Sequence, residues 1–539
     1  MRNLLSWLMP MTIVTLSFLY AVALNEDFIK RVDSALLVTK DSLDSIYKEW
    51  DIGHYPLFLR SCFMHKLAWE QMKLKFQHRM LAAAKTDKKE PTKFVISFTG
   101  SSVTAGHDSH FNKSTPIVAG DYLTPAFAAM DIELDSRNVA LGNNPCTPYD
   151  VCVKFFAGLD ADMVHWEQSY FCEGRPIIEQ FIRQAMAMPS KPLVIFSESH
   201  TGKWQHKDCK DKPKSHDKLT KEEEDILRAP NPVYLVSEAN KVSLQRRWKW
   251  MQEYTHAYHG AGLQLFEHMA HDVYACQGPY IPTWMEGAAS WHPSVIGHRM
   301  RAAHHAYFWL LGWQEALQDL RNQSSHRVME AMEKDVDHRL NKLITPMGPA
   351  RHKSEFPDGA NCYTDYEPRP VREASLKDRV VEGLGTNATH GWKFVIYENL
   401  VDKNLVLKTH RMQYKDFKHL IYGNKDSGPL SLKIDLKEDG PIFICETPGI
   451  WGSLPKGFAH LWSPTVEVYM TANVENRDNF KFNPELGVKY ELNYDKKHEI
   501  CTRIQPAHTK DPKIKAGNYV LTIVGRSESK AIIAWIITP

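Results

Sequence analysis

Short apolar runs alternate with longer amphipathic stretches between residues 90 and 320. The apolar runs have the length of buried strands and lie at 94–98, 132–141, 163–166, 193–196 and 263–266. Apolar residues recur with helical spacing at 177–188, 237–259 and 295–311. Strands separated by helices predict an α/β fold, with a doubly wound parallel sheet in a flavodoxin-like three-layer sandwich.

A different pattern begins after the prolines and glycines of the stretch 346–359. Short runs rich in β-branched and aromatic residues, separated by turn residues, follow at 394–397, 405–407, 430–434, 442–444, 466–470, 490–493, 519–524 and 531–537. This pattern predicts a C-terminal β-sandwich domain over 361–539, with a jelly roll as the alternative. Ahead of it we expect a helical N-terminal lead-in over 24–90, the α/β domain over 91–320 and a helical linker segment over 321–360.

The first 23 residues have the form of a secretory signal. The basic Arg2 precedes an apolar run, which ends in Ala-Val-Ala shortly before the acidic Glu26. We therefore expect a signal peptide over 1–23 and a mature chain that is extracellular or in the Golgi or ER lumen. The run is also long enough to span a bilayer, so an uncleaved N-terminal anchor is the alternative, and the one expected contact with a membrane.

The cysteines and sequons fit the same compartment. Nine Cys are expected to form disulfides in an oxidising environment with one left over, and Cys146 and Cys152 are close enough in sequence to close a small loop. The sequons at Asn112, Asn322 and Asn387 predict a glycoprotein.

The charge balance and the spacing of the histidines indicate which partners and cofactors to expect. The chain has 66 Lys+Arg against 64 Asp+Glu and no long basic stripe, which argues against a nucleic-acid partner. Several histidines stand near predicted strand ends: His107, His165, His200 and His268. Neither His-x-His, His-Glu-x-x-His nor Cys-x-x-Cys spacing occurs, so we expect no metal and no other cofactor.

Three segments at predicted strand and helix ends carry candidate chemistry. The first strand of the α/β domain runs into Gly-Ser-Ser-Val-Thr-Ala-Gly at 100–106, which predicts that Ser102 stands at the carboxyl edge of the sheet, where such folds hold catalytic groups. Gly142 ends the next predicted strand and can bring a backbone N–H close to a developing oxyanion. His292 begins a predicted helix and can act as general base toward a serine.

In this order the three segments resemble the blocks of the SGNH/GDSL hydrolase superfamily. The segment 100–106 resembles its Gly-Asp-Ser-x-Thr-x-Gly block, with Ser102 at the nucleophile position and Ser101 in place of the usual Asp. The segment 138–142 resembles the block with the oxyanion glycine, and 292–298 the block with the catalytic His. The resemblance covers about residues 93–312 and implies an ester hydrolase or acyltransferase. Within the superfamily, the stretch is most similar to secreted SGNH-like proteins of algae and related protists.

Two family positions hold residues that lack the family's chemistry. Strand register puts Phe171 where the family has its oxyanion Asn, so Gln168 or Asn143 would have to donate that hydrogen bond. Ala289 stands three residues before the catalytic His, where the family has the acid of its triad. Glu286 or a backbone carbonyl would then orient the imidazole, or the enzyme would work with a Ser-His dyad.

The resemblance implies a serine esterase that cleaves an acyl ester, an O-acetyl group above all, from a glycan or glycoconjugate by Ser-His acyl transfer. Four tryptophans are candidates for either a sugar-binding surface or the core: Trp166, Trp204, Trp284 and Trp291. Two alternatives remain open: a non-catalytic glycan-binding cell-surface protein on a degenerate SGNH scaffold, and a membrane-anchored glycan O-acyltransferase.

Overall fold

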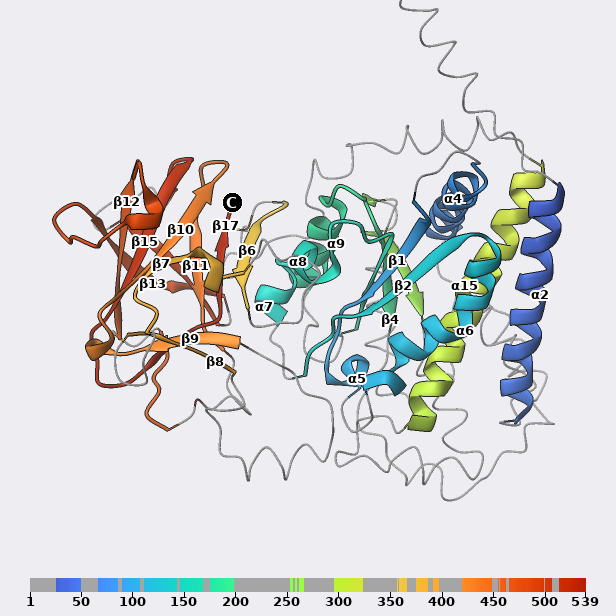
Figure 1. Ribbon diagram of the computed structural model, residues 1–539, viewed down its shortest axis with the longest axis horizontal. Coiled ribbons are helices and arrows are strands. Elements are labelled where there is room, and N and C mark those ends of the chain that lie inside the picture. Colours follow the sequence, from blue (N-terminus) through green and yellow to red (C-terminus); the bar gives the residue numbers. More distant parts are fainter. Residues whose placement is uncertain are drawn as a thin grey trace, which may run out of the picture.

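The computed structural model describes residues 26–49, 66–85, 90–106, 111–142, 146–167, 175–197, 253–254, 257–258, 261–265, 295–322, 356, 358–365, 375–385, 391–396, 419–447, 454, 456–461, 465–498, 500–506 and 513–539. An α/β domain comes first and a β domain second, and the two lie side by side (Figure 1). The expectation of an α/β domain followed by a β domain is confirmed.

Five strands form the sheet of the α/β domain in the order β2-β1-β3-β4-β5, and every neighbouring pair is parallel. The strands are β1 (Thr92–Phe98), β2 (Ile132–Asn138), β3 (Met163–Trp166), β4 (Leu193–Ser197) and β5 (Ala261–Leu265). Each overlaps the run predicted for it, although β2 stops at Asn138, before the predicted end at 141.

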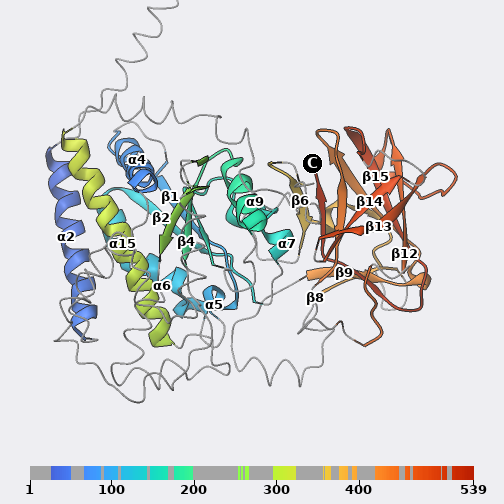
Figure 2. The same cartoon turned by 180° about the vertical axis from the view of Figure 1, so that it is seen from behind.

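Helices cover both faces of this sheet (Figures 1 and 2). Phe94, Ile96 and Phe98 of β1 pack into one core, whereas Val95 packs into the other. The first core is closed by α2 (Glu26–Glu49), α4 (Lys66–Ala83), α6 (Thr115–Ala129) and α15 (Val295–Asn322). The second is closed by α7 (Cys146–Tyr149), α8 (Val153–Ala157) and α9 (Arg175–Met186). The shorter α5 (Ser102–Ala105) and η1 (Phe111–Lys113) lie between β1 and α6.

None of the helices within the described residues is long and apolar enough to cross a membrane. Two of the three sequons lie on the described part of the chain, with Asn112 in η1 and Asn322 at the end of α15. Both residues are exposed, as a glycan requires. Asn387 and the segment 1–23 lie outside the described residues.

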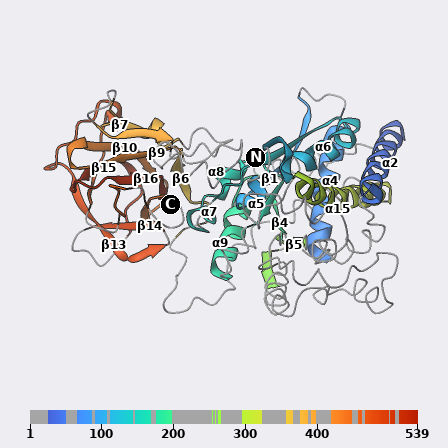
Figure 3. The same cartoon turned by 90° about the horizontal axis from the view of Figure 1, so that it is seen from below.

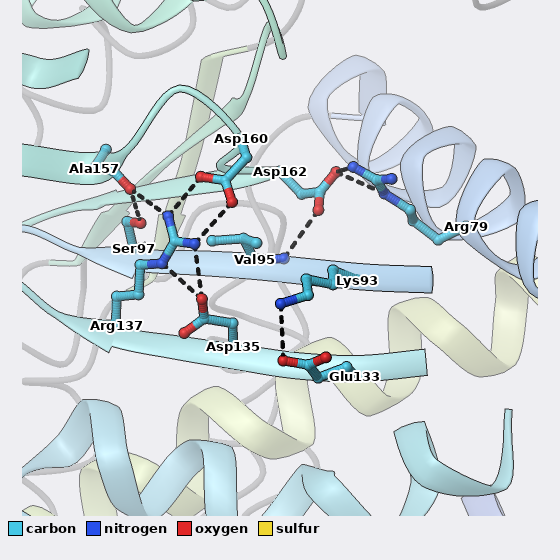
Figure 4. A network of polar contacts seen from close by, with 10 residues as sticks. All are labelled: Arg79, Lys93, Val95, Ser97, Glu133, Asp135, Arg137, Ala157, Asp160 and Asp162. Atoms are coloured by element: carbon cyan, nitrogen blue, oxygen red, sulfur yellow. Dashed lines mark hydrogen bonds and ion pairs between the residues drawn. The ribbon is translucent and has the colours of Figure 1, made fainter. Parts of the chain in front are cut away.

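A network of ion pairs fastens the first strands to their surroundings (Figure 4). Arg137 of β2 contacts both oxygens of Asp160, at 2.6 and 2.8 Å, and Asp135 at 2.7 Å. Burial alone would lower the pKa of Arg137, but the hydrogen bonds with Asp160 and Asp135 outweigh it, so that the pKa is raised. Arg79 of α4 contacts the buried Asp162 at 2.6 Å, and this pair holds α4 against the start of β3.

Antiparallel strands make up the β domain. Its nine-stranded sheet has the order β6-β17-β11-β14-β13-β12-β15-β10-β7, and a three-stranded sheet has the order β16-β9-β8. The strands are β6 (Asn361–Thr364), β7 (Val380–Glu382), β8 (Lys393–Ile396), β9 (His419–Gly423), β10 (Pro429–Leu436), β11 (Ile442–Cys445), β12 (Val466–Ala472), β13 (Val488–His498), β14 (Cys501–Pro506), β15 (Gly517–Gly525), β16 (Ala531–Ile533) and β17 (Trp535–Thr538). Single turns of 3-10 helix are η6 (Lys377–Arg379), η8 (Lys425–Ser427) and η9 (Arg477–Asn479).

The two domains share a hydrophobic core. Leu141, Tyr149 and Phe156 of the α/β domain pack there with Phe443 and Trp535 of the β domain. Figure 3 shows β6 and the ends of α7 and α8 between the two domains. The described structure is therefore joined through the layer that contains α7 and α8, on the side of the sheet opposite α2 and α15.

A disulfide crosses this joint. Cys152, which precedes α8, is bonded to Cys362 of β6 and so does not close the small loop with Cys146 that their spacing would allow. Cys445 and Cys501 form a second disulfide between β11 and β14, and Cys146 is also disulfide-bonded. The expectation that the cysteines form disulfides is thus confirmed for these residues.

Lys154 of α8 crosses the same joint. Its Nζ donates to Gly359 O at 2.5 Å and to Asn361 Oδ1 at 3.0 Å. Burial, followed by the charge of Lys437, lowers the pKa of Lys154 to about 8. A neutral amine still has N–H donors for both oxygens, so the two hydrogen bonds do not need the charge.

Because the folded-state pKa of Lys154 is about 8 against 10.5 as the usual value, the unfolded chain binds the extra proton between these pH values. This group should therefore add stability as the pH rises from about 8 to 10.5. We expect the stability of the wild type, relative to Lys154→Met, to increase between pH 7 and pH 10 in urea unfolding. A pH-independent difference between the two proteins would contradict this.

Candidate functional site

Backbone hydrogen bonds continue the sheet past the regular ends of its first strands. On one side of β1, Leu141 N donates to Gly100 O at 3.1 Å. On the other side, Ser101 N donates to Glu167 O at 3.0 Å. The segment before Ser102 is therefore held between the segment that leads to Gly142 and the residue that follows β3, at the carboxyl edge of the sheet.

Gly100 allows the chain to turn at this edge. Its φ of +155° is one that other residues rarely adopt. A Cβ at this position would lie 2.9 Å from Thr104 Oγ1 and 3.0 Å from Glu167 O. The close packing of β1, α5 and the end of β3 thus depends on a glycine here.

Ser102 is the first residue of α5 and is 8% exposed. The residue before it, Ser101, caps the helix, because its Oγ accepts a hydrogen bond from Val103 N at 3.2 Å. Gly106 ends the helix in the left-handed conformation. Ser102 therefore stands on a single helical turn whose two ends are both defined.

A buried carboxylate, which the sequence pattern did not single out, lies beneath this turn. Glu167 follows β3 and is fully buried. Its Oε2 accepts hydrogen bonds from Ser101 Oγ at 2.8 Å, from Thr104 Oγ1 at 2.9 Å and from Ser101 N at 3.3 Å. An acidic residue directly after the mostly apolar run 163–166 was the available signal, because a carboxylate at such a position is rarely buried without partners.

The segment that carries Gly142 is tied to α5 through Asn138. The Nδ2 of Asn138 donates to Ala105 O at 3.1 Å and to Ser114 Oγ at 3.0 Å, and its Oδ1 accepts from Ala140 N at 3.3 Å. One side chain thus links the end of β2 to the end of α5 and to the start of α6. It sets the path of the backbone that leads to Gly142.

The remaining predicted site residues lie outside the described residues, namely His292, Gln168, Asn143, Glu286, Phe171 and Ala289. The described chain resumes at Val295, the first residue of α15. Within the first turns of α15, the buried His298 has its Nδ1 2.9 Å from Thr115 Oγ1 and accepts a hydrogen bond from Thr115 N at 3.2 Å. His298 therefore joins the start of α15 to the start of α6, which α5 also contacts.

Further histidines pack in the core below this edge. His165 of β3 lies against the ring of Phe98, with ring centroids 4.8 Å apart, and His305 of α15 lies 5.1 Å from His165. Burial, and then His305, lowers the pKa of His304 well below its usual range. Across the residues that the structure describes, no group of three or more His, Cys, Asp or Glu is arranged to hold a metal ion.

Trp166 is a core residue rather than part of a sugar-binding surface. It is 1% exposed and packs on Phe181 of α9, with ring centroids 4.2 Å apart. Trp204, Trp284 and Trp291 lie outside the described residues. A sugar-binding role for Trp166 is therefore excluded.

No protein-family model and no curated protein matches the chain. Among solved structures it is similar to a two-domain esterase (CEX) active on acetylated mannans, with a TM-score of 0.33, 11% identity and coverage of 83% of this chain and 91% of that chain. The same esterase co-crystallized with mannopentaose gives a TM-score of 0.36, 10% identity and coverage of 83% and 92%.

Proposed function

We propose that this chain is a secreted or luminal serine esterase of the SGNH type, which removes an acyl group, an O-acetyl group above all, from a glycan. One observation carries the proposal: the register of β2, β1 and β3 brings the segments of Ser102 and Gly142 together at the carboxyl edge of a parallel sheet. In doubly wound folds this edge is where catalytic groups act. The strand order β2-β1-β3-β4-β5 is the one found in flavodoxin-like folds.

The proposed reaction has two steps. His292 takes the proton of Ser102 Oγ, which attacks the acyl carbonyl, and the sugar oxygen leaves with that proton. Water, deprotonated by His292, then attacks the acyl-enzyme and releases the carboxylic acid and free Ser102. The backbone N–H groups of Ser102 and Gly142 hold the oxyanion in both steps, and Gln168 or Asn143 adds the remaining donor.

The proposal also states which group orients the imidazole of His292. Glu286 or a backbone carbonyl accepts a hydrogen bond from the imidazole of His292, or the pair works as a dyad. The glycan as substrate rests on the resemblance of the sequence blocks to secreted members of the superfamily. The disulfides of the described residues fit the same oxidising compartment.

Ser102→Ala tests the proposal on a chromogenic acetyl ester and on an acetylated glycan. We expect kcat to fall by roughly 1000-fold or more, together with loss of covalent labelling by a fluorophosphonate probe. Ser97→Ala is the matched control, because Ser97 is a buried serine of β1 whose Oγ donates to Ala157 O at 2.5 Å. It should keep both activity and labelling.

Other outcomes would favour the alternatives. Activity that survives unchanged in Ser102→Ala would mean that this site is not an esterase, and a non-catalytic glycan-binding protein would then be the better reading. Transfer of the acyl group to an added sugar hydroxyl rather than to water would indicate an O-acyltransferase. Sequencing the mature N-terminus separates a secreted chain from an anchored one.

A further inference from the structure

We propose that Glu167 is the positioning residue for Ser102, because its carboxylate fixes the single helical turn on which Ser102 stands. The inference rests on the proposed function, in which Ser102 is the nucleophile. Glu167 itself follows β3, outside α5, and its carboxylate hydrogen-bonds to Ser101 and Thr104, one on each side of Ser102 in the sequence.

The hydrogen bonds form a connected chain. Val103 N donates to Ser101 Oγ at 3.2 Å, and Ser101 Oγ in turn donates to Glu167 Oε2 at 2.8 Å. Thr104 Oγ1 donates to the same oxygen at 2.9 Å. The capping hydroxyl of α5 is therefore held by a group outside the helix, and both ends of the first turn converge on one carboxylate oxygen.

A helix as short as α5 needs such support. Its four residues form few internal hydrogen bonds, whereas fixing the first turn costs most of the entropy of helix formation. Donors to a carboxylate form stronger hydrogen bonds than donors to a neutral oxygen. The orientation of the Ser102 hydroxyl and backbone N–H, which both depend on the backbone of this turn, is thereby set from β3.

Burying the Glu167 carboxylate has a cost in free energy. Burying a charged group is unfavourable unless hydrogen bonds compensate, and here three groups donate to one oxygen of Glu167. A backbone bond from Ser101 N to Glu167 O already joins the two strands at this point. Strand pairing therefore does not require the side chain, and what the carboxylate adds is control of α5.

The experiment compares kcat and KM on an acetyl ester for Glu167→Ala, Thr104→Val and their double variant. A misplacement of about 1 Å at a nucleophile costs on the order of 100-fold in rate. We expect Glu167→Ala to lower kcat by about 100-fold and Thr104→Val by about 10-fold, each with KM changed by less than about threefold. Because Thr104 acts through Glu167, Thr104→Val should lower kcat by no more than about twofold further in the Glu167→Ala background.

Thr99→Val is the matched control. Thr99 is as buried as Thr104, but its Oγ1 donates to His165 O at 2.5 Å instead of to Glu167. It should lower the melting temperature about as much as Thr104→Val while changing kcat by less than about twofold. If Glu167→Ala fails to fold, the kcat of Thr104→Val compared with the kcat of Thr99→Val tests the proposal instead.

Three results would overturn the inference alone, provided that Ser102→Ala abolishes activity. These are an unchanged kcat in folded Glu167→Ala, an equal loss of kcat in Thr99→Val and Thr104→Val, and multiplicative effects in the double variant. If Ser102→Ala remains active, the proposed function is wrong and the positioning role is wrong with it.

Discussion

Replacing Trp313 with Ala is expected to lower the free energy of unfolding by about 3–5 kcal/mol, the range for a fully buried aromatic side chain. Trp313 of α15 is 0% exposed and stacks on Phe76 of α4, with ring centroids 4.3 Å apart. Its ring also meets Phe94 of β1 at 5.5 Å and Phe127 of α6 at 4.7 Å, both edge to face. One side chain thus joins three helices to the sheet, and the cavity left by alanine would loosen all of them.

Two variants serve as controls in urea unfolding. Trp313→Phe should cost much less, because it keeps an aromatic ring and removes an indole N–H that has no hydrogen-bond acceptor among the described residues. Trp69→Ala removes the same residue type from a half-buried position on α4, where Trp69 packs against Phe308 and donates to Glu315, and should also cost less. Equal losses in Trp313→Ala and Trp69→Ala would contradict the assignment of Trp313 as the centre of this core.

The central strands of the parallel sheet could be predicted because β1, over most of its length, and β3 are buried on both faces. Apolar residues dominate the runs at 94–98 and 163–166, with Ser97 and His165 as the polar exceptions, and a polar residue follows each run. The predicted run at β2 was too long because Val139, Ala140 and Leu141 are apolar, yet they leave the regular strand to pack elsewhere. There the Asn138 side chain hydrogen-bonds to Ala140 N, and Leu141 joins the core shared with the β domain.

Helices and strands whose residues do not divide into an apolar and a polar face were not predicted from the sequence. α6 contains two prolines and a glycine, and its exposed face includes Pro125 and Ala128, so no clearly polar face marks it as a helix. Residues 531–537 form one apolar run in the sequence but two strands in different sheets. The break falls at Ala534, whose backbone N–H donates to Cys445 O and whose carbonyl accepts from Thr364 Oγ1. Because these hydrogen bonds join residues far apart in the sequence, no local sequence pattern predicts them.

The same limit applies to the candidate site. The Gly-Ser-Ser turn could be placed at the carboxyl edge because it directly follows a clear strand. The role of Glu167 could not be inferred in this way, because its contacts with Ser101 and Thr104 depend on the register between β1 and β3. The Cys152–Cys362 disulfide spans 210 residues, and nothing in the cysteine spacing identifies this pairing.

Removing that disulfide, with Cys152→Ser and Cys362→Ser together, is expected to lower the free energy of unfolding by roughly 2–5 kcal/mol. The bond closes a loop of 210 residues, so its loss releases considerable entropy in the unfolded chain. Cys152 lies ten residues after Gly142 and directly before α8, whereas Cys445 and Cys501 lie on β11 and β14, although all four cysteines belong to the core shared by the two domains. Removing the Cys152–Cys362 bond should therefore lower kcat on an acetyl ester even at temperatures where the double variant is folded.

The Cys445→Ser and Cys501→Ser pair is the matched control, since it removes a buried disulfide that joins β11 to β14 within the β domain. Its loop spans only 56 residues, so chain entropy predicts a loss smaller by about 1 kcal/mol. Neither cysteine belongs to the segment of Gly142, so kcat should stay at the wild-type value well below the melting temperature. Thermal unfolding and steady-state rates measured on both pairs separate the two effects. If the two pairs lower kcat equally, the loss comes from the core that all four cysteines share, and the Cys152–Cys362 disulfide does not specifically support the site.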